Sequence, residues 1–316
     1  MSKHTESPTP KAPNASPAAH RCGYVALIGR PNAGKSTLLN AVLGQKVAIV
    51  THKPQTTRDR LLAIHTTPQY QMIFLDTPGV HRPVGKLGRY MNEAAYGALR
   101  EADVTVWLID MHDRNRADGL TAPERALLQR IADRRNPVIA VLNKIDLLRD
   151  KQRLLPIMAE LAAHNLGDCL LPLSAKTQDG LPVLLDEIQA RLPEGPAVFP
   201  DDIVSDKADK YFVSELVREA ITLQTDKEVP YKTAVVIDRY VEEQRRTVIH
   251  ATIFVERDSQ KGIMIGKGGQ RLVQIGTAAR AQIEAMLGTP VTLHLHVNVA
   301  PNWTADPAKL REMGYQ

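Results

Sequence analysis

The segment 29–36 constrains this chain more than any other. It matches the phosphate-loop pattern GxxxxGK[ST] at each fixed position, and it lies between an apolar, strand-like segment, 24–28, and a helix-like segment, 37–43. Glycines let successive backbone N–H groups surround a phosphate, and the N-terminus of the following helix adds positive charge there. The pattern therefore predicts a strand–loop–helix unit that binds a nucleoside triphosphate, although a glycine turn that merely ends in Lys-Ser remains the simpler alternative. The residues expected at the nucleotide are Gly29, Arg30, Pro31, Asn32, Ala33, Gly34, Lys35, Ser36 and Thr37.

A second motif is expected on the metal side of this site. Residues 70–75 are typical of a strand, and they lead into Asp76-Thr77-Pro78-Gly79. An aspartate at the carboxyl end of a buried strand is well placed to hold Mg²⁺, and a glycine lets its N–H approach a γ-phosphate. Alone, this tetrapeptide is a common turn sequence. Downstream of a phosphate loop, it predicts a metal and γ-phosphate sensor made of Asp76, Thr77, Pro78, Gly79 and Val80.

A third motif indicates which base is bound. The apolar strand-like run 137–142 leads into Asn143-Lys144-Ile145-Asp146. A carboxylate at Asp146 can accept two hydrogen bonds, from N1–H and the 2-amino group of guanine, whereas adenine offers no such pair of donors. A surface turn is the alternative for a lone match. The order of the motifs favours guanine, and we expect Asn143, Lys144 and Asp146 at the base, together with Ser174, Ala175 and Lys176 after the next strand. The Ala175 N–H is expected to donate to guanine O6.

The remainder of the chain predicts a second domain. Residues 193–206 are rich in Pro and Asp and are expected to form a linker. The expected order after it is helix, strand, strand, helix, helix, strand. A helix is expected near 208–224, strands near 232–241 and 247–256, a loop at 263–271 before a helix that ends near 287, and a last strand at 291–299.

A glycine-rich loop between the last two helices of that domain fits the pattern GxxG. Such a loop packs closely against an RNA backbone, because glycines let main chain approach phosphates and the next helix points its N-terminus at them. Glycine-rich turns between helices are common, so the order of elements and the basic flank are needed to favour single-stranded RNA. The expected RNA contacts are Ile265, Gly266, Lys267, Gly268, Gly269 and Arg271.

Length and composition agree with two globular domains. The chain has 316 residues and a formal net charge of +5, which is compatible with nucleic acid or an anionic membrane surface and proves neither. The two cysteines are far apart and form no metal-spaced pair. No apolar run is long enough to cross a bilayer, and no signal-peptide core is apparent. Residues 1–21, rich in Pro, Ala, Ser and Thr, are expected to be a disordered tail.

Taken together, these motifs resemble the Era GTPases of bacteria from Gly23 to the C-terminus. The most specific feature is Lys53-Pro54-Gln55-Thr56-Thr57-Arg58 joined to a K-homology (KH) domain. The resemblance implies an α/β fold: a Ras-like P-loop GTPase domain (G domain) with a doubly wound, mostly parallel sheet, followed by an α+β type II KH domain. The implied divisions are a G domain at 22–192, a linker at 193–206, a KH domain at 207–300 and a C-terminal tail at 301–316.

The same resemblance implies a function and partners. It implies GTP hydrolysis, binding near the 3′ end of 16S rRNA, and a role in maturation and assembly of the 30S subunit. It also implies a monomer in the cytoplasm with peripheral association with the inner membrane. Two rival classes stay open: a GTPase with no RNA partner, and an RNA-binding protein whose nucleotide domain is only a scaffold.

A mechanism follows from the resemblance as a hypothesis. Lys35, Thr57, Asp76 and Gly79 would act in hydrolysis, with Ser36, Thr57 and Asp76 around Mg²⁺. Asn32 resembles the K⁺-ligating asparagine of related GTPases. Val80 stands where Ras-like enzymes often have a water-orienting glutamine, so intrinsic turnover is expected to be slow. GTP is expected to order residues 53–60 and the segment after Asp76, a change that the RNA-binding domain would sense.

Overall fold

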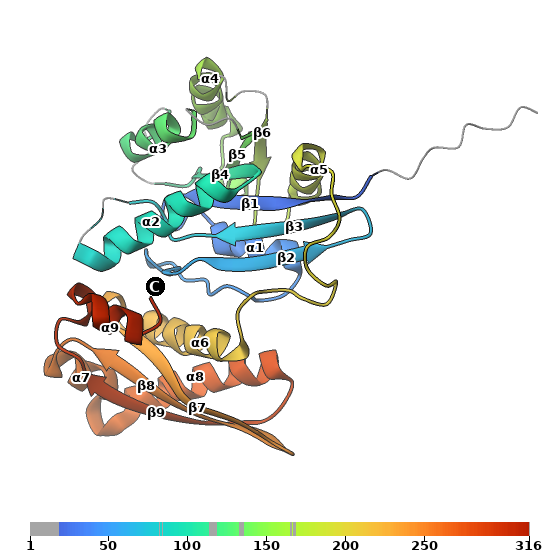
Figure 1. Ribbon diagram of the computed structural model, residues 1–316. Helices are drawn as coiled ribbons and strands as arrows, with labels where there is room; N and C mark the ends of the chain where they lie inside the picture. Colours follow the sequence, from blue (N-terminus) through green and yellow to red (C-terminus); the bar gives the residue numbers. More distant parts are fainter. Residues whose placement is uncertain are drawn as a thin grey trace, which may run out of the picture.

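The computed structural model describes residues 19–81, 83, 85–113, 119–132, 136–164, 166 and 169–315 (Figure 1). These residues form two sheets with their helices, one above the other in the view of Figure 1. The predicted disordered tail falls almost wholly outside the described residues. Its last residue, Arg21, does not belong to a tail, because it begins strand β1 and pairs in parallel with Tyr70.

The N-terminal sheet has six strands in the order β2-β3-β1-β4-β5-β6, in which only β2 and β3 are antiparallel neighbours. Its central strands are buried on both faces, which explains their nearly continuous apolar sequences. The strands are β1 (Arg21–Gly29), β2 (Leu61–Thr66), β3 (Tyr70–Asp76), β4 (Val104–Asp110), β5 (Val138–Asn143) and β6 (Leu170–Leu173).

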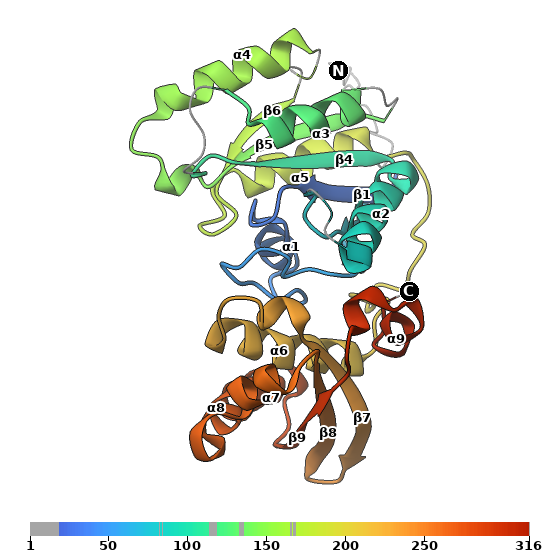
Figure 2. The same cartoon turned by 90° about the vertical axis from the view of Figure 1, so that its left-hand side faces the viewer.

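Helices cover both faces of this sheet (Figures 1 and 2). One apolar core joins the sheet to α1 and α5, and a second core on the opposite face joins it to α2, α3 and α4. The predicted doubly wound sheet is therefore confirmed. The helices are α1 (Lys35–Leu43), α2 (Gly85–Glu101), α3 (Ala122–Ala132), α4 (Leu155–Ala163) and α5 (Leu181–Arg191), and short 3₁₀ helices η1 (Ile145–Leu147) and η2 (Lys151–Leu154) precede α4.

The C-terminal sheet has three strands in the order β7-β8-β9, with β7 and β8 antiparallel and β8 and β9 parallel. Residues of α6, α7 and α8 share an apolar core with it. The chain order is the predicted helix, strand, strand, helix, helix, strand. The elements are α6 (Asp209–Gln224), η3 (Pro230–Lys232), β7 (Ala234–Glu243), β8 (Arg246–Val255), α7 (Asp258–Ile265), η4 (Lys267–Gly269), α8 (Gln270–Leu287) and β9 (Val291–Val299).

The predicted linker, 193–206, lies along the N-terminal sheet. The amide oxygen of the fully buried Gln71 accepts hydrogen bonds from the N–H groups of Val198 and Phe199, at 2.8 and 2.9 Å. Further along, the Ile64 N–H of edge strand β2 donates to the Val204 carbonyl at 2.8 Å. The segment is therefore bound to the edge of the sheet for much of its length.

The last residues fold as well. The segment 301–315, predicted only as a tail, contains η5 (Trp303–Ala305) and α9 (Pro307–Glu312). Trp303 is fully buried and stacks on Tyr315 with ring centroids 5.8 Å apart. These residues share an apolar cluster with Leu87 and Met91 of α2, so the C-terminal segment lies between the two domains (Figure 2).

Candidate functional site

The phosphate loop occupies the turn between β1 and α1. The side chain of Lys35 folds back across the loop, and its Nζ donates to the carbonyls of Gly29 at 3.3 Å and Arg30 at 3.2 Å. Burial lowers the pKa of Lys35 to about 8, against the opposing effect of the Asp76 carboxylate. An anion bound in the loop would therefore strongly favour the charged form of this lysine.

Two glycines allow close approaches that other residues would prevent. Gly34 has a φ of +100°, and a Cβ at this position would lie 2.2 Å from the Asn143 side-chain nitrogen. A Cβ at Gly79 would lie 2.5 Å from the backbone nitrogen of Pro31. The need for glycine at 79 was predicted from a γ-phosphate, and the structure adds a second reason: this residue packs directly against the phosphate loop.

The three residues predicted around Mg²⁺ lie together. Ser36 Oγ is 2.9 Å from Thr57 Oγ1 and donates to Asp76 Oδ2 at 3.0 Å. Asp76 is fully buried, and its other oxygen, Oδ1, has no hydrogen-bond partner among the residues that the structure describes. Burial raises the pKa of Asp76 to about 6. Two hydroxyls and a carboxylate with an unpaired buried oxygen fit Mg²⁺, which prefers oxygen ligands.

The residues predicted at the base surround Asn143, at the end of β5. Asn143 Nδ2 donates to the Ala33 carbonyl at 2.7 Å, and Asn143 Oδ1 accepts from the Ala175 N–H at 3.0 Å. This side chain therefore joins the phosphate loop to the turn 174–176. The Ser174 hydroxyl donates to Asp146 Oδ1 at 2.7 Å and orients the exposed carboxylate. Because the Ala175 N–H already has an acceptor, guanine O6 would have to share it.

A cavity of about 930 Å³ brings most of the predicted phosphate and metal residues together. Its lining includes Pro31, Asn32, Gly34, Lys35, Ser36, Thr37, Thr57, Gly79 and Lys144. Of the residues predicted at the base, only Lys144 lines this cavity; Asn143, Asp146, Ser174, Ala175 and Lys176 lie outside its lining, and Asn143 joins them to the phosphate loop through its hydrogen bond to Ala33. Gln55 and Thr56, from the segment that GTP is expected to order, also line the wall. Sequence reasoning missed other residues there: Ile49, Val50, Thr51, His52, Asp110, His112 and Asp113. Asp110 could have been found from the sequence, because it is an aspartate at the carboxyl end of a buried strand, β4, as Asp76 is of β3. It pairs with Lys144 at 2.6 Å.

Arg30 and Val80 border an adjoining cavity of about 400 Å³ instead. The Arg30 guanidinium pairs with Asp113, so it points away from Lys35 toward the end of β4. Val80 donates its N–H to the Gly29 carbonyl at 3.0 Å, and its side chain packs against an apolar core. Both residues are next to the phosphate loop, and the Val80 side chain offers no hydrogen-bonding group.

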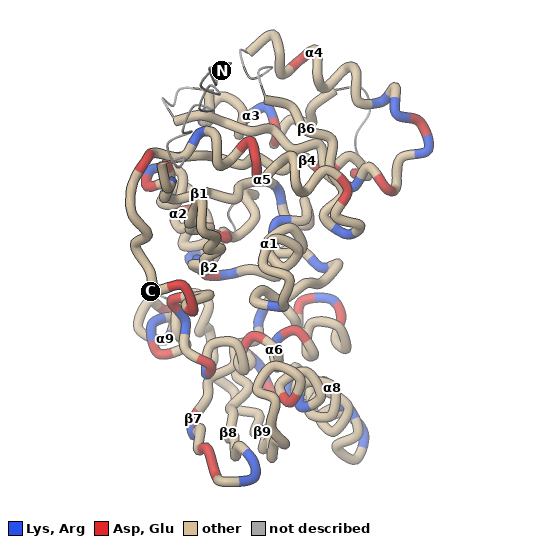
Figure 3. The backbone as a smooth tube through the Cα atoms, turned by 90° about the vertical axis from the view of Figure 1, so that its right-hand side faces the viewer, with Lys and Arg blue, Asp and Glu red and all other residues tan. Residues whose placement is uncertain are grey.

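The segment between α1 and β2 is held by the C-terminal domain. Ile49 is buried in the apolar core of that domain, and the Val50 N–H donates to Glu219 Oε1 at 2.8 Å. Lys53 Nζ pairs with Asp226 at 2.9 Å. Figure 3 shows basic and acidic positions close together where this segment meets α6. The segment therefore contacts both the candidate nucleotide cavity and the second domain.

Arg58 makes the most buried of these contacts. It is 2% exposed, and its two terminal nitrogens donate to the carbonyls of Pro230 at 2.6 Å and Thr233 at 2.7 Å. It also donates to the Tyr315 hydroxyl at 3.2 Å. This residue follows Thr57 directly, so a residue predicted at Mg²⁺ is adjacent to an anchor in the second domain.

The predicted RNA loop lies on the surface between α7 and α8. Gly266, Gly268 and Gly269 have φ angles of +72°, +58° and +80°. Open space surrounds the position of a Cβ at Gly268 and Gly269, whereas a Cβ at Gly266 would lie 2.8 Å from the Cβ of Arg271. The Arg271 guanidinium donates to the Ile263 carbonyl at 2.9 Å. Exposed backbone at Gly268 precedes the N-terminus of the long helix α8, as close approach to phosphates requires.

Comparison with known families assigns both domains. Residues 24–144 match the family described as 50S ribosome-binding GTPase, and residues 228–304 match the KH domain family. The first match includes the phosphate loop and the residues predicted around Mg²⁺. The second includes β7, β8, the RNA loop and β9.

Relatives and solved structures match over nearly the whole chain. The GTPase Era of Syntrophus aciditrophicus is 43% identical over 93% of this chain and 95% of its own length, and that of Geobacter metallireducens is 42% identical over 93% and 98%. The structure of an Era in complex with MgGDPNP and nucleotides 1506–1542 of 16S ribosomal RNA is 39% identical, with a TM-score of 0.89, over 94% of this chain and 99% of that one. Aquifex aeolicus Era Y63A bound to GDP·AlF4⁻ is also 39% identical, with a TM-score of 0.88, over 93% and 99%. The chain belongs to the Era family of GTPases.

Proposed function

We propose that this chain is a GTP-hydrolysing switch that binds 16S rRNA near its 3′ end and assists assembly of the 30S subunit and maturation of its rRNA. The observation that carries the proposal is that one chain combines a phosphate loop, hydrogen-bonded to the guanine motif through Asn143, with an open GxxG loop in a KH domain. The solved Era complex with a 16S rRNA segment, similar over 94% of this chain, supports the choice of RNA.

In the proposed reaction, this chain positions GTP and stabilises charge. Lys35 contacts the β- and γ-phosphate oxygens, and the N–H groups of the loop surround the phosphates. Ser36, Thr57 and Asp76 would hold Mg²⁺, which would supply positive charge to offset the negative charge of the phosphates. Gly79 brings its N–H close to the γ-phosphate. Val80 cannot orient a water molecule by hydrogen bonding, so the intrinsic turnover is slow.

The proposed base site distinguishes guanine from adenine through Asp146. Asn143 keeps the guanine motif next to the phosphate loop, and Ser174 orients the Asp146 carboxylate. Lys144 lines the wall of the cavity. The turn Ser174-Ala175-Lys176 would contact the base as well, with the Ala175 N–H directed at guanine O6.

The RNA loop provides the first test. Replacing Gly268 with Asp should raise the Kd for a single-stranded RNA with the 16S 3′-end sequence at least about tenfold, because the new carboxylate would repel phosphates next to the α8 N-terminus. Filter binding with the purified full chain measures this change. Nothing lies within 4 Å of the Cβ position, so the carboxylate displaces no protein atom.

Gly288 supplies a matched control for that test. It also has a positive φ, +68°, and open space around its Cβ position, but it lies at the far end of α8. Gly288→Asp introduces the same charge and a similar backbone strain, and it should leave RNA affinity within about twofold of wild type. Equal losses of RNA affinity in the two variants would contradict the proposed role of the loop.

The switch needs its own test. Repeating the RNA titrations with GDP and with a non-hydrolysable GTP analogue shows whether the bound nucleotide changes RNA affinity, as the switch requires.

We also propose that K⁺ stimulates hydrolysis through Asn32. The side chain of Asn32 lies on the wall of the cavity and donates to the His52 carbonyl at 2.8 Å, so an amide and a carbonyl meet beside the phosphate loop. Oxygen donors of this kind suit a hard cation, whose charge would assist the reaction at the phosphates. Exchanging K⁺ for Na⁺ should slow the wild-type rate, and Asn32→Ala should remove that difference. An Asn32→Ala variant that keeps full K⁺ stimulation would exclude this role.

Further proposals rest on the resemblance to the Era GTPases. The chain is a cytoplasmic monomer that associates peripherally with the inner membrane. Its domains are divided by residues 193–206, with the G domain beginning at Arg21, the first residue of β1, and the KH domain at 207–300. Within the part of the chain that the structure describes, no helix is long and apolar enough to cross a membrane.

A further inference from the structure

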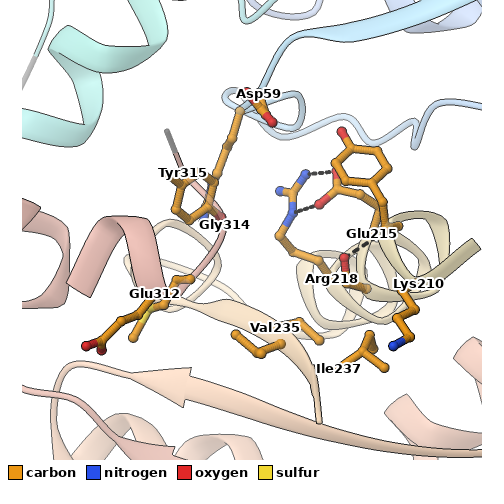
Figure 4. A pocket seen from close by; sticks show the side chains of 14 residues that line it. Asp59, Lys210, Glu215, Arg218, Val235, Ile237, Glu312, Gly314 and Tyr315 are labelled. Carbon is orange, nitrogen blue, oxygen red and sulfur yellow. Dashed lines mark hydrogen bonds and ion pairs between the residues drawn. The ribbon is translucent and has the colours of Figure 1, made fainter. Parts of the chain in front are cut away.

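Arg218 of α6 lies where the C-terminal domain faces the GTPase domain. It is 2% exposed, and its Nε and Nη2 contact the two carboxylate oxygens of Glu215 at 2.7 and 2.5 Å (Figure 4). The same Nη2 donates to the backbone carbonyl of Thr56. A two-point pair with a carboxylate fixes the plane of a guanidinium. Arg218 is therefore a rigid donor aimed at one carbonyl of the other domain.

The Thr56 carbonyl belongs to the same planar peptide as the Thr57 N–H. A donor that fixes this carbonyl therefore also fixes the peptide from which the Thr57 side chain projects. Thr57 Oγ1 lies 2.9 Å from Ser36 Oγ, which in turn donates to Asp76 Oδ2 at 3.0 Å. One peptide thus connects the Arg218 guanidinium to the three residues proposed to hold Mg²⁺.

The segment around Thr57 lies outside regular secondary structure. Residues 51–60 are described throughout and form neither helix nor strand, and the hydrogen bonds that hold Thr56 from within the segment go through its side chain, to Thr51 and Lys53. Arg218 holds the residue before Thr57. On the other side, Arg58 is bound by the carbonyls of Pro230 and Thr233. The C-terminal domain therefore fixes the chain immediately before and immediately after this threonine.

We propose that Arg218 is a positioning residue for GTP hydrolysis, which acts from the RNA-binding domain by holding the Thr56 carbonyl and so placing the Thr57 hydroxyl at Mg²⁺. The inference rests on the proposed function and adds a second-domain residue to it. Glu215 already neutralises the guanidinium, so Arg218 contributes geometry and not positive charge at the phosphates. Disturbing the contact between the domains should consequently change the metal site, even though that site contains no C-terminal-domain residue among those that the structure describes.

The test replaces Arg218 with Met in the full chain. Methionine keeps much of the apolar stem and removes every donor. The rate of GTP hydrolysis at saturating GTP should fall at least about tenfold, the equivalent of about 1.4 kcal/mol, and half-maximal activity should require more Mg²⁺. Affinity for GDP should stay within about twofold, because a nucleotide without a γ-phosphate depends less on the Thr57 segment. A purely structural role would instead weaken GDP binding and thermal stability together.

Arg246 provides the matched control, because it pairs with Glu243 at the same i,i+3 spacing and 2.9 Å but is exposed at the start of β8. Arg246→Met should leave the rate, the Mg²⁺ requirement and GDP affinity unchanged. Arg218→Lys keeps the charge without the planar guanidinium, so the rate and the Mg²⁺ requirement should change in the same directions but less. This variant tests the inference if Arg218→Met does not fold. A folded Arg218 variant with the wild-type rate and Mg²⁺ requirement overturns the inference. Wild-type protein that does not hydrolyse GTP overturns the proposed function instead.

Discussion

Replacing Lys35 with Ala should reduce GTP hydrolysis at least about 100-fold, because removal of one well-placed charged donor from a developing phosphate charge has effects of this size. The side chain is 5% exposed and crosses the phosphate loop, so no water molecule can easily take over its position. Phosphate release from GTP by the purified chain, with Mg²⁺ and K⁺ present, measures the effect. A rate within about threefold of wild type would show that the loop does not act on GTP as proposed.

The same substitution should not weaken the nucleotide-free fold. Burial lowers the pKa of Lys35 from its usual 10.5 to about 8, so the charged form costs the folded state about 3 kcal/mol at neutral pH before the hydrogen bonds are counted. For a base whose pKa is lower in the folded state, that cost is full below pH 8 and disappears as pH rises to 10.5. Lys35→Ala should therefore unfold at the same or a higher temperature than wild type.

Lys309 is the control for Lys35. Its Nζ also donates to a backbone carbonyl, that of Pro301 at 2.9 Å. Lys309 belongs to α9, however, and does not line the candidate nucleotide cavity. Lys309→Ala should change neither hydrolysis nor, by more than about 0.5 kcal/mol, the free energy of unfolding. Loss of activity in Lys35→Ala alone, without loss of stability, separates a role at the phosphates from damage to the fold.

Most of the fold could be predicted because its signals are local. Buried parallel strands such as 137–142 are continuous apolar runs, and the glycine-rich loops are contiguous motifs that carry their own geometry. The element order of the second domain followed from these patterns, and the doubly wound sheet followed from the resemblance that the motifs carry. The folded C-terminal segment did not, because the cluster that buries Trp303 and Tyr315 includes residues of α2 and β7, far away in the sequence.

In the candidate site too, local motifs could be predicted from the sequence and contacts between distant residues could not. Phosphate, metal and guanine motifs were each predicted from a short stretch, and the structure brings them around Lys35, Ser36 and Asn143. The contacts of the segment before β2 could not be predicted, because Arg58 meets acceptors more than 170 residues away. The apolar run 47–50 did not reveal these contacts, because Val47 and Ala48 pack in the core of the GTPase domain whereas Ile49 packs in that of the C-terminal domain.

Base recognition gives the second large effect. In Asp146→Asn, an amide replaces the carboxylate that is proposed to accept from N1–H and the 2-amino group of guanine. A donor NH₂ group then faces a donor on the base, so GTP affinity should fall about 10- to 100-fold. Xanthine carries a carbonyl oxygen where guanine carries the 2-amino group, and that oxygen can accept from the new amide. Xanthosine triphosphate should therefore bind the variant better than it binds wild type.

Competition against a fluorescent nucleotide measures both changes, with ATP as a third competitor that should bind neither protein well. Asp150→Asn is the matched control: the same change, four residues on, at an exposed carboxylate that only caps the short helix η2. It should keep the wild-type order of affinities. The most informative result is a lower affinity for GTP together with a higher affinity for xanthosine triphosphate. A misfolded site would bind GTP more weakly without binding xanthosine triphosphate more tightly. An Asp146→Asn variant that still prefers GTP would show that other residues recognise guanine.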